Sequence, residues 1–204
     1  MIIKNEEEKI NYLNDCILAG SLPVFNTYKH VLGSEIKKVK IKREISSENG
    51  FDVIITSTAR DNETIKNTMY GFNDDNGIAP VLLLLELQAP GGGGGSNNLQ
   101  GLWSYGGLGG GSGAYSCLLI DLLAADSYEI DIGEAGSGGN FDSNTSGGFP
   151  GNNGGDITVK VIKEDSNLTV LTLYGGEGGL SSSTNSQKIS GGQGGNITLS
   201  DNYI

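Results

Sequence analysis

The chain has 204 residues and is acidic, because 24 aspartates and glutamates stand against 13 lysines and arginines and give a formal net charge of −11 at pH 7. Arg43 and Arg60 are the only arginines, so the chain is poorly suited to gripping the phosphate backbone of a nucleic acid. The length suffices for one substantial core or for a domain with an appended arm.

A helix is predicted first, over residues 6–18. Asn5 and Glu8 have the spacing of a capping box, and Gly20 is suited to end the helix. Three apolar residues fall on one face of this segment, namely Ile10, Leu13 and Ile17. We expect a short docked helix or arm here.

A β-hairpin is predicted next. The segment KKVKIKREI alternates apolar with charged residues, ENG provides a turn, and FDVIITST is rich in β-branched residues. Lysines 37, 38, 40 and 42 with Arg43 form either a patch for an acidic partner, such as the tail of a neighbouring copy, or the solvated face of the strand. A run of charged residues usually forms the solvent-exposed face of a strand or helix. We interpret residues 1–69, the helical arm plus the hairpin, as an attachment region.

The composition changes after residue 90. Of the 34 glycines, 29 lie in residues 91–204. Apolar strand patterns separate the glycine tracts, first at residues 81–87 and then within AYSCLLIDLLAADSYEIDIG, DITVKVIKEDSNLTVLTLY and NITLS, with a hairpin closing near residues 165–167. Short strands with turn signals between them predict an antiparallel β-sandwich, jelly-roll-like, over residues 70–204.

The glycine tracts admit three interpretations. A disordered linker does not repeatedly alternate with patterned strands, and a phosphate-binding loop requires a glycine spacing that GSGAYS, from Gly111, lacks. The third is packing, in which extended helices without Cβ atoms lie close enough to hydrogen-bond to one another, as in collagen. Packing would make the glycines a scaffold and leave the loops between them exposed, whereas the sequence leaves open that the tracts are ordinary loops of the sandwich.

Residues for catalysis or metal binding are sparse. His30 is the only histidine, which removes the schemes that need two histidines or a metal cluster. The separation of Cys16 from Cys117 fits no zinc or redox motif, and Asp74 with Asp75 lacks the spacing of a calcium loop. We therefore expect no catalytic residues, no metal and no cofactor.

Membrane insertion and standard secretion are not expected either. The longest apolar runs, PVLLLLEL and CLLIDLLAA, are too short to span a bilayer. The first residues, MIIKNEEEK, carry three glutamates where a signal peptide needs positive charge. If the protein works outside a cell, we expect it to leave by lysis or assembly.

Aromatic residues are the candidates for binding. Trp103 and Tyr105 lie within LQGLWSYGGLGG, flanked by glycine, and amphipathic rings on loops commonly anchor recognition surfaces. The other interpretation is that Trp103 fills the side of the sandwich. Tyr115, at the end of the second glycine tract, is the third candidate.

The order of five segments in the chain resembles that of a known family. GIAPVLLLLELQAPGGGGG, GGLGGGSGAY, SYEIDIGEAGSGG, GFPGNNGGDITV and LTLYGGEGGL follow one another in a way that resembles the glycine-rich domain of phage tail-fibre and other viral structural proteins. Ala114 and Tyr115 match the family's Gly-Ala-Tyr. Four further residues match the segment after its second strand pair, namely Ile132, Gly133, Ala135 and Gly136. Residues 122–126 depart from the family by replacing a Pro-Gly turn, and the resemblance spans residues 70–180.

The resemblance implies a virion protein without catalytic activity, which assembles in the host cytoplasm. Such a protein is a minor capsid, fibre or tail component that contacts other virion proteins, and a homo-oligomer is within this expectation. The alternative is an adhesin that recognises host surface carbohydrate or protein through its glycine-rich loops.

Overall fold

The computed structural model describes residues 2–3, 35–47, 50–72, 82–96, 98–100, 103–105, 107–122, 125–142, 147–164, 166–181 and 191–200. Every regular element among these residues is a β-strand, and every strand pairing is antiparallel. The protein is therefore mainly β, as predicted. The predicted helix over residues 6–18 lies outside the described residues.

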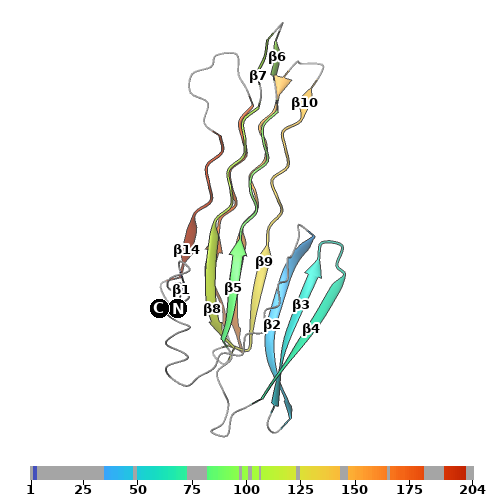
Figure 1. Cartoon of the computed structure of the whole chain (residues 1–204), viewed down its shortest axis with the longest axis vertical. Coiled ribbons are helices and arrows are strands. Elements are labelled where there is room, and N and C mark those ends of the chain that lie inside the picture. The colour runs from blue at the N-terminus through green and yellow to red at the C-terminus, as the bar shows by residue number, and fades with distance from the viewer. Residues whose placement is uncertain are drawn as a thin grey trace.

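A seven-stranded sheet forms most of the base of the molecule, with the strand order β14-β13-β12-β9-β2-β3-β4 (Figure 1). Its strands are β2 (Ile36–Ser47), β3 (Gly50–Ala59), β4 (Thr64–Phe72), β9 (Ser127–Ile132), β12 (Ile157–Lys163), β13 (Ser166–Leu173) and β14 (Ile197–Leu199). Both predicted hairpins are confirmed, since β2 pairs with β3 and β12 pairs with β13.

A smaller sheet covers part of the large one. It has the order β1-β8-β5, with β1 (Ile2–Ile3), β5 (Leu82–Gln88) and β8 (Tyr115–Asp121). The strand predicted over residues 81–87 corresponds to β5, which ends one residue later than predicted. The long segment between β5 and β8 leaves the sheet and returns to it.

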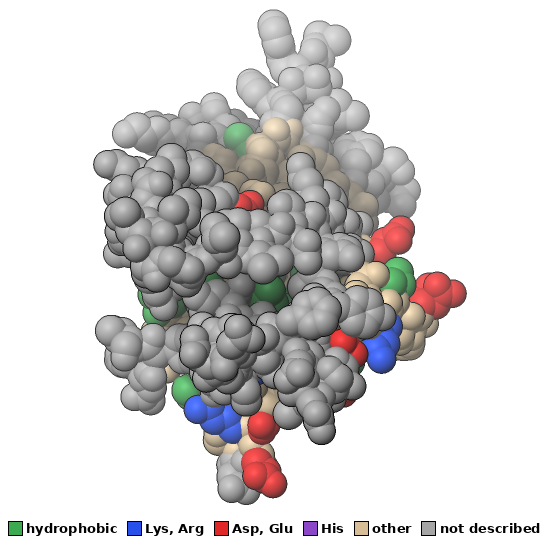
Figure 2. Space-filling view, turned by 60° about the horizontal axis from the view of Figure 1, so that its bottom comes forward, with side chains coloured by type: hydrophobic (Ala, Val, Ile, Leu, Met, Phe, Trp, Pro, Cys, Tyr) green, Lys and Arg blue, Asp and Glu red, His purple; other side chains and the backbone are tan. Residues whose placement is uncertain are grey.

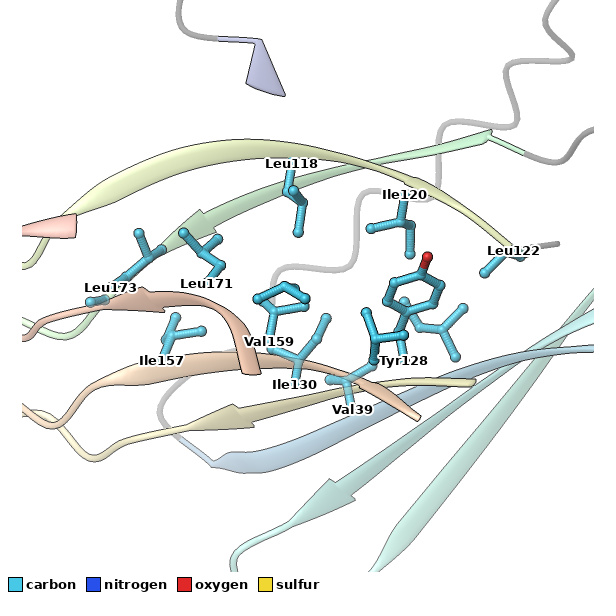
Figure 3. Close-up of a cluster of buried hydrophobic side chains, with 14 of the residues drawn as sticks. Val39, Leu118, Ile120, Leu122, Tyr128, Ile130, Ile157, Val159, Leu171 and Leu173 are labelled. Carbon is cyan, nitrogen blue, oxygen red and sulfur yellow. The ribbon is translucent and has the colours of Figure 1, made fainter. Parts of the chain in front are cut away.

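The hydrophobic core lies between the two sheets. Along β12 the side chains of Ile157, Val159 and Val161 are buried while those between them are less so, which is the two-residue period of a strand with one face inward. Figure 3 shows Leu118 and Ile120 of β8 pointing toward the buried side chains of the large sheet. The remaining labelled side chains of that cluster are Val39, Leu122, Tyr128, Ile130, Leu171 and Leu173.

The hairpin β2–β3 continues the sheet built by the later residues, because β2 pairs with β9 along Lys38–Lys42. Arg60, in the turn between β3 and β4, adds a second connection. Its Nη2 donates to the carbonyl oxygens of Ile132 (3.3 Å) and Gly133 (2.7 Å), and its Nη1 lies 3.1 Å from a carboxylate oxygen of Glu134. The division into an attachment region and a glycine-rich domain stays a prediction.

Candidate functional site

Six glycine-rich tracts extend from the strands of the base. They are tract I (residues 89–96), tract II (107–114), tract III (133–140), tract IV (149–156), tract V (174–181) and tract VI (191–196). Figure 1 shows the traces after β5 and β9, and before β8, rising from the base to the opposite end of the molecule. Tracts I, III and V follow a strand of the base directly, and tracts II, IV and VI lead directly into one, so the direction of the strand fixes the direction of its tract.

The tracts are joined to one another by backbone hydrogen bonds that repeat every three residues. The amide groups of Ala89, Gly92 and Gly95 donate to tract II at 2.8, 2.9 and 2.8 Å. Gly93 donates to tract IV and accepts from tract V, while Gly91 accepts from tract III. Three residues per turn without internal hydrogen bonds is the geometry of polyproline II. The structure therefore contains packed glycine helices, the third of the interpretations that the sequence left open.

The pairings arrange the tracts in two layers of three. Tract I contacts tracts II, III, IV and V, and tract V contacts tracts I, II, IV and VI. One layer therefore has the order II-I-III and the other has the order VI-V-IV, with tracts I and V at the centres. Tract I runs antiparallel to tracts II and IV and parallel to tracts III and V, as the residue numbers of the bonded pairs show.

Most of these glycines are required by their neighbours. A Cβ atom on Gly93 would lie 2.0 Å from the carbonyl oxygen of Ser137, and one on Gly176 would lie 2.0 Å from that of Gly111. Backbone atoms cannot move aside as the end of a side chain can. Close approach of backbones therefore demands glycine here, as it does on the axis of collagen.

Polar side chains in the tracts complete the hydrogen bonding. Asp156 accepts from the amide of Gly175 at 3.0 Å, and Asn153 accepts from the amide of Gly178 at 2.8 Å. Glu177 accepts from the amide of Gln193 at 3.1 Å. These residues were not predicted from the sequence, although their spacing was a signal, since Asn153 and Asp156 lie three residues apart, which is one turn of the helix.

Two strand pairs lie at the end of the bundle away from the base (Figure 1). One pair is β6 (Asn98–Gln100) with β7 (Trp103–Tyr105), and the other is β10 (Phe141–Asp142) with β11 (Gly147–Gly148). β6 and β11 contact each other. We call this pair of hairpins the tip, and it is the candidate functional site.

The structure divides the three candidate binding residues between two places. Trp103 and Tyr105 belong to β7 in the tip, where their backbones pair with Gln100 and Asn98. Tyr115 belongs to β8 in the base; the residue is 54% exposed, and its hydroxyl lies 3.2 Å from the sulfur of Cys117. The eight residues of tract II separate β7 from Tyr115, which at polyproline II rise is about 25 Å.

The lysines of β2 are paired within the chain. Lys38 and Lys40 lie 2.8 and 3.3 Å from Glu129 of β9, and Lys160 lies 2.6 Å from Asp131. Figure 2 likewise shows acidic and basic side chains next to one another at the margin of the base. This pairing favours the solvated strand face over a patch for an acidic partner.

These contacts shift the ionisation of the paired groups. The hydrogen bond from Lys38 and the charges of both lysines hold the pKa of Glu129 below its ordinary value, although burial acts to raise it. Burial also acts to raise the pKa of Asp131, but the hydrogen bond from Lys160 and the charge of Lys38 outweigh it and lower that pKa. The hydrogen bond to Glu129 raises the pKa of Lys38.

In the described part of the chain, no group of three histidine, cysteine or carboxylate side chains is placed to hold a metal ion. That part also contains no helix with the length and hydropathy needed to cross a membrane.

The part of the chain that combines short strands with hydrogen-bonded glycine tracts matches a known family. The sequence model of the glycine-rich domain matches residues 84–202. The chain belongs to this glycine-rich domain family. No curated protein and no solved structure matches the chain. The matched residues run from within β5 to beyond β14, so the glycine-rich domain includes all six tracts and the tip.

Proposed function

We propose that this protein is a non-enzymatic structural component of a virus particle, a minor capsid, fibre or tail protein that is assembled in the host cytoplasm. In this proposal the region that includes the β2–β3 hairpin attaches to other virion proteins. The glycine-rich domain then extends outward or contacts neighbouring proteins. The resemblance to viral glycine-rich domains supports the virion role.

The observation that carries the proposal is the bonding of the tracts. A flexible glycine linker leaves its ends free to move, whereas each tract here is bonded to at least two others. The bundle therefore supports the tip at a fixed distance from the base. We also infer that the two sheets of the base form a β-sandwich, because their side chains share one core, and the jelly-roll-like connectivity stays a prediction.

Quantitative mass spectrometry of purified virus particles tests the virion role. A copy number commensurate with the shell lattice supports a minor capsid protein, and a few copies per particle support a fibre or tail component. Complete absence from the particles contradicts the proposal.

The alternative function is that of an adhesin for host surface carbohydrate or protein. The contact between β6 and β11 favours it, because two loops far apart in sequence form one surface at the end of a bundle. Aromatic residues on such surfaces commonly supply most of the binding energy. Trp103 and Tyr105 are the candidates in the tip.

Replacing Trp103 with alanine tests the adhesin. We expect binding to host cells to weaken at least tenfold, which corresponds to about 1.4 kcal/mol, while the melting temperature stays nearly unchanged. Tyr174→Ala is the matched control, since Tyr174 is an exposed aromatic residue at the base end of tract V. A large loss of stability in Trp103→Ala would instead show that the indole is part of the packing.

A further inference from the structure

The two outer faces of the glycine bundle differ in their chemistry. Tracts I and V are each central in their layer and each contact four other tracts. A helix with three residues per turn directs its backbone groups to all sides. Each central tract therefore directs some amide and carbonyl groups toward an outer face of the bundle.

The face of tract V is closed by side chains. The amides of Gly175 and Gly178, which have no tract to bond to, donate to the side chains of Asp156 and Asn153. Tyr174, Glu177 and Leu180 follow one another at three-residue intervals and are all exposed on tract V. These side chains keep another backbone from approaching closely.

The face of tract I is bare. Among the described residues, the amides of Gly91 and Gly94 and the carbonyl oxygens of Gly92 and Gly95 have no hydrogen-bond partner. Gly94 is exposed, and tract I has no side chain between Pro90 and Ser96. The two carbonyl oxygens lie beside tract II, close to Gly110 and Gly107. Unpaired donors and acceptors thus both occur along tract I.

At two glycines of this face, packing within one copy does not demand the absence of a side chain. A Cβ atom on Gly94 would lie 3.5 Å from the nearest atom, the carbonyl oxygen of Leu108. One on Gly138, in the adjacent tract III, would lie 3.6 Å from the carbonyl oxygen of Gly94. Both are ordinary contact distances, unlike the 2.0 Å found for Gly93.

We propose that the face formed by tracts II, I and III binds the same face of a second copy of this chain, so that the packing of glycine helices continues across the interface. Tract I is self-complementary because it offers both donors and acceptors. Tract I already bonds to parallel and to antiparallel neighbours, so two copies related by a two-fold axis are compatible with its hydrogen-bond geometry.

Charge also favours this face. The chain carries a net charge of −11, which opposes self-association. Tracts I and II contain no charged residue, and the one carboxylate of tract III, Glu134, is paired with Arg60. A glycine tract can approach tract I along its whole length, because it has no Cβ atoms to hold the two backbones apart. A second polyglycine face is therefore the occupant that fits.

Sedimentation equilibrium of the full chain, up to millimolar concentration, tests the proposal. We expect a reversible monomer–dimer equilibrium for the wild type. The double variant Gly94→Val and Gly138→Val adds side chains that protrude from the face, and we expect its dimer dissociation constant to rise at least tenfold with an unchanged melting temperature. Neither glycine has a left-handed φ, so valine is compatible with the backbone.

Gly194→Val is the control variant. Gly194 lies in tract VI of the other layer, and a Cβ atom there would also have 3.6 Å to its nearest neighbour. This variant is expected to dimerise as the wild type does. A wild-type protein that stays monomeric at every concentration overturns the proposal, and so does a dimer that survives in the double variant or is lost equally in the control.

Discussion

At the scale of the residue, the same amino acid has opposite roles at different positions of the bundle. Gly93 is buried, donates to one tract and accepts from another. Gly109 has no atom within 4 Å of the place where a Cβ would stand. The entropy that glycine loses on folding is similar at both positions. Of these two positions, only Gly93 has no room for a Cβ atom, so only there must the residue be glycine despite this entropy cost.

Gly93→Ala is therefore expected to lower the free energy of unfolding by about 3 kcal/mol, the upper range for overpacking. Gly109→Ala, the matched control, is expected to be neutral or to stabilise by up to about 1 kcal/mol, because alanine restricts the unfolded chain. Denaturant unfolding followed by circular dichroism measures both values. Equal effects of the two substitutions would contradict the close packing of tract I.

Ser57 is a second position where the structure makes a residue-level prediction. Its side chain is fully buried, its position in β3 pairs with Val39, and its hydroxyl oxygen has no hydrogen-bond partner among the described residues. An unpaired buried hydroxyl is unfavourable. Ser57→Ala is expected to raise the free energy of unfolding by about 1 kcal/mol. Chemical denaturation checks this, and a clear loss of stability would reveal a bond that the hydroxyl makes.

At the scale of the element, the strands and their hairpin partners could be predicted, whereas partners far apart in the sequence could not. The alternation in KKVKIKREI and FDVIITST indicated the β2–β3 hairpin because the pattern and its turn are local. The pairing of β2 with β9 joins residues about ninety positions apart, and no local pattern encodes it. For the same reason the lysines of β2 could not be assigned to Glu129 and Asp131 beforehand.

The arrangement of the tracts and of the candidate binding residues also depends on contacts between distant residues. The repeated strands between the tracts argued against a flexible linker, but the sequence did not decide between packed helices and ordinary loops. The order of the tracts within the layers depends on which carbonyl each amide meets, and every tract offers similar backbone groups. The separation of Tyr115 from Trp103 and Tyr105 depends on the direction of tract II, which the sequence does not display.

The ion pairs across β2, β9 and β12 predict how stability depends on pH. Glu129 and Asp131 have pKa values below their ordinary values of 4.5 and 3.8, so their contribution is fully present above those values. It is lost as the pH falls through the lowered pKa values of the folded protein. Lys38, whose pKa is raised above 10.5, contributes below that pH and loses its contribution as the pH rises through the raised value.

Glu129→Gln is the variant that isolates this effect. Its free energy of unfolding should fall less steeply than that of the wild type between about pH 5 and pH 3, because one titrating group with a lowered pKa is gone. Urea unfolding at several pH values measures the slopes. Glu164→Gln is the control, since Glu164 is exposed and lies outside the ion pairs. Parallel pH profiles for wild type and Glu129→Gln would refute the role of Glu129.

At the scale of the whole molecule, base and bundle are built from the same strands. β5, β9 and β13 run directly into tracts I, III and V, and tracts II, IV and VI run directly into β8, β12 and β14. No flexible connection therefore separates a folded base from a folded bundle. A strand that leaves the sheet removes its tract from the bundle as well.

This continuity predicts one cooperative unfolding transition. Val159→Ala, in the core of the base, and Gly93→Ala, in the bundle, should each shift a single calorimetric peak to lower temperature without splitting it. Val159 is fully buried between the sheets and lies two residues into β12, the strand that follows tract IV. Unfolding of the base would therefore expose the bundle, and unfolding of the bundle would expose the base. Two separate transitions, with Gly93→Ala moving only one of them, would show that the bundle unfolds on its own and that the tip is supported by the tracts alone.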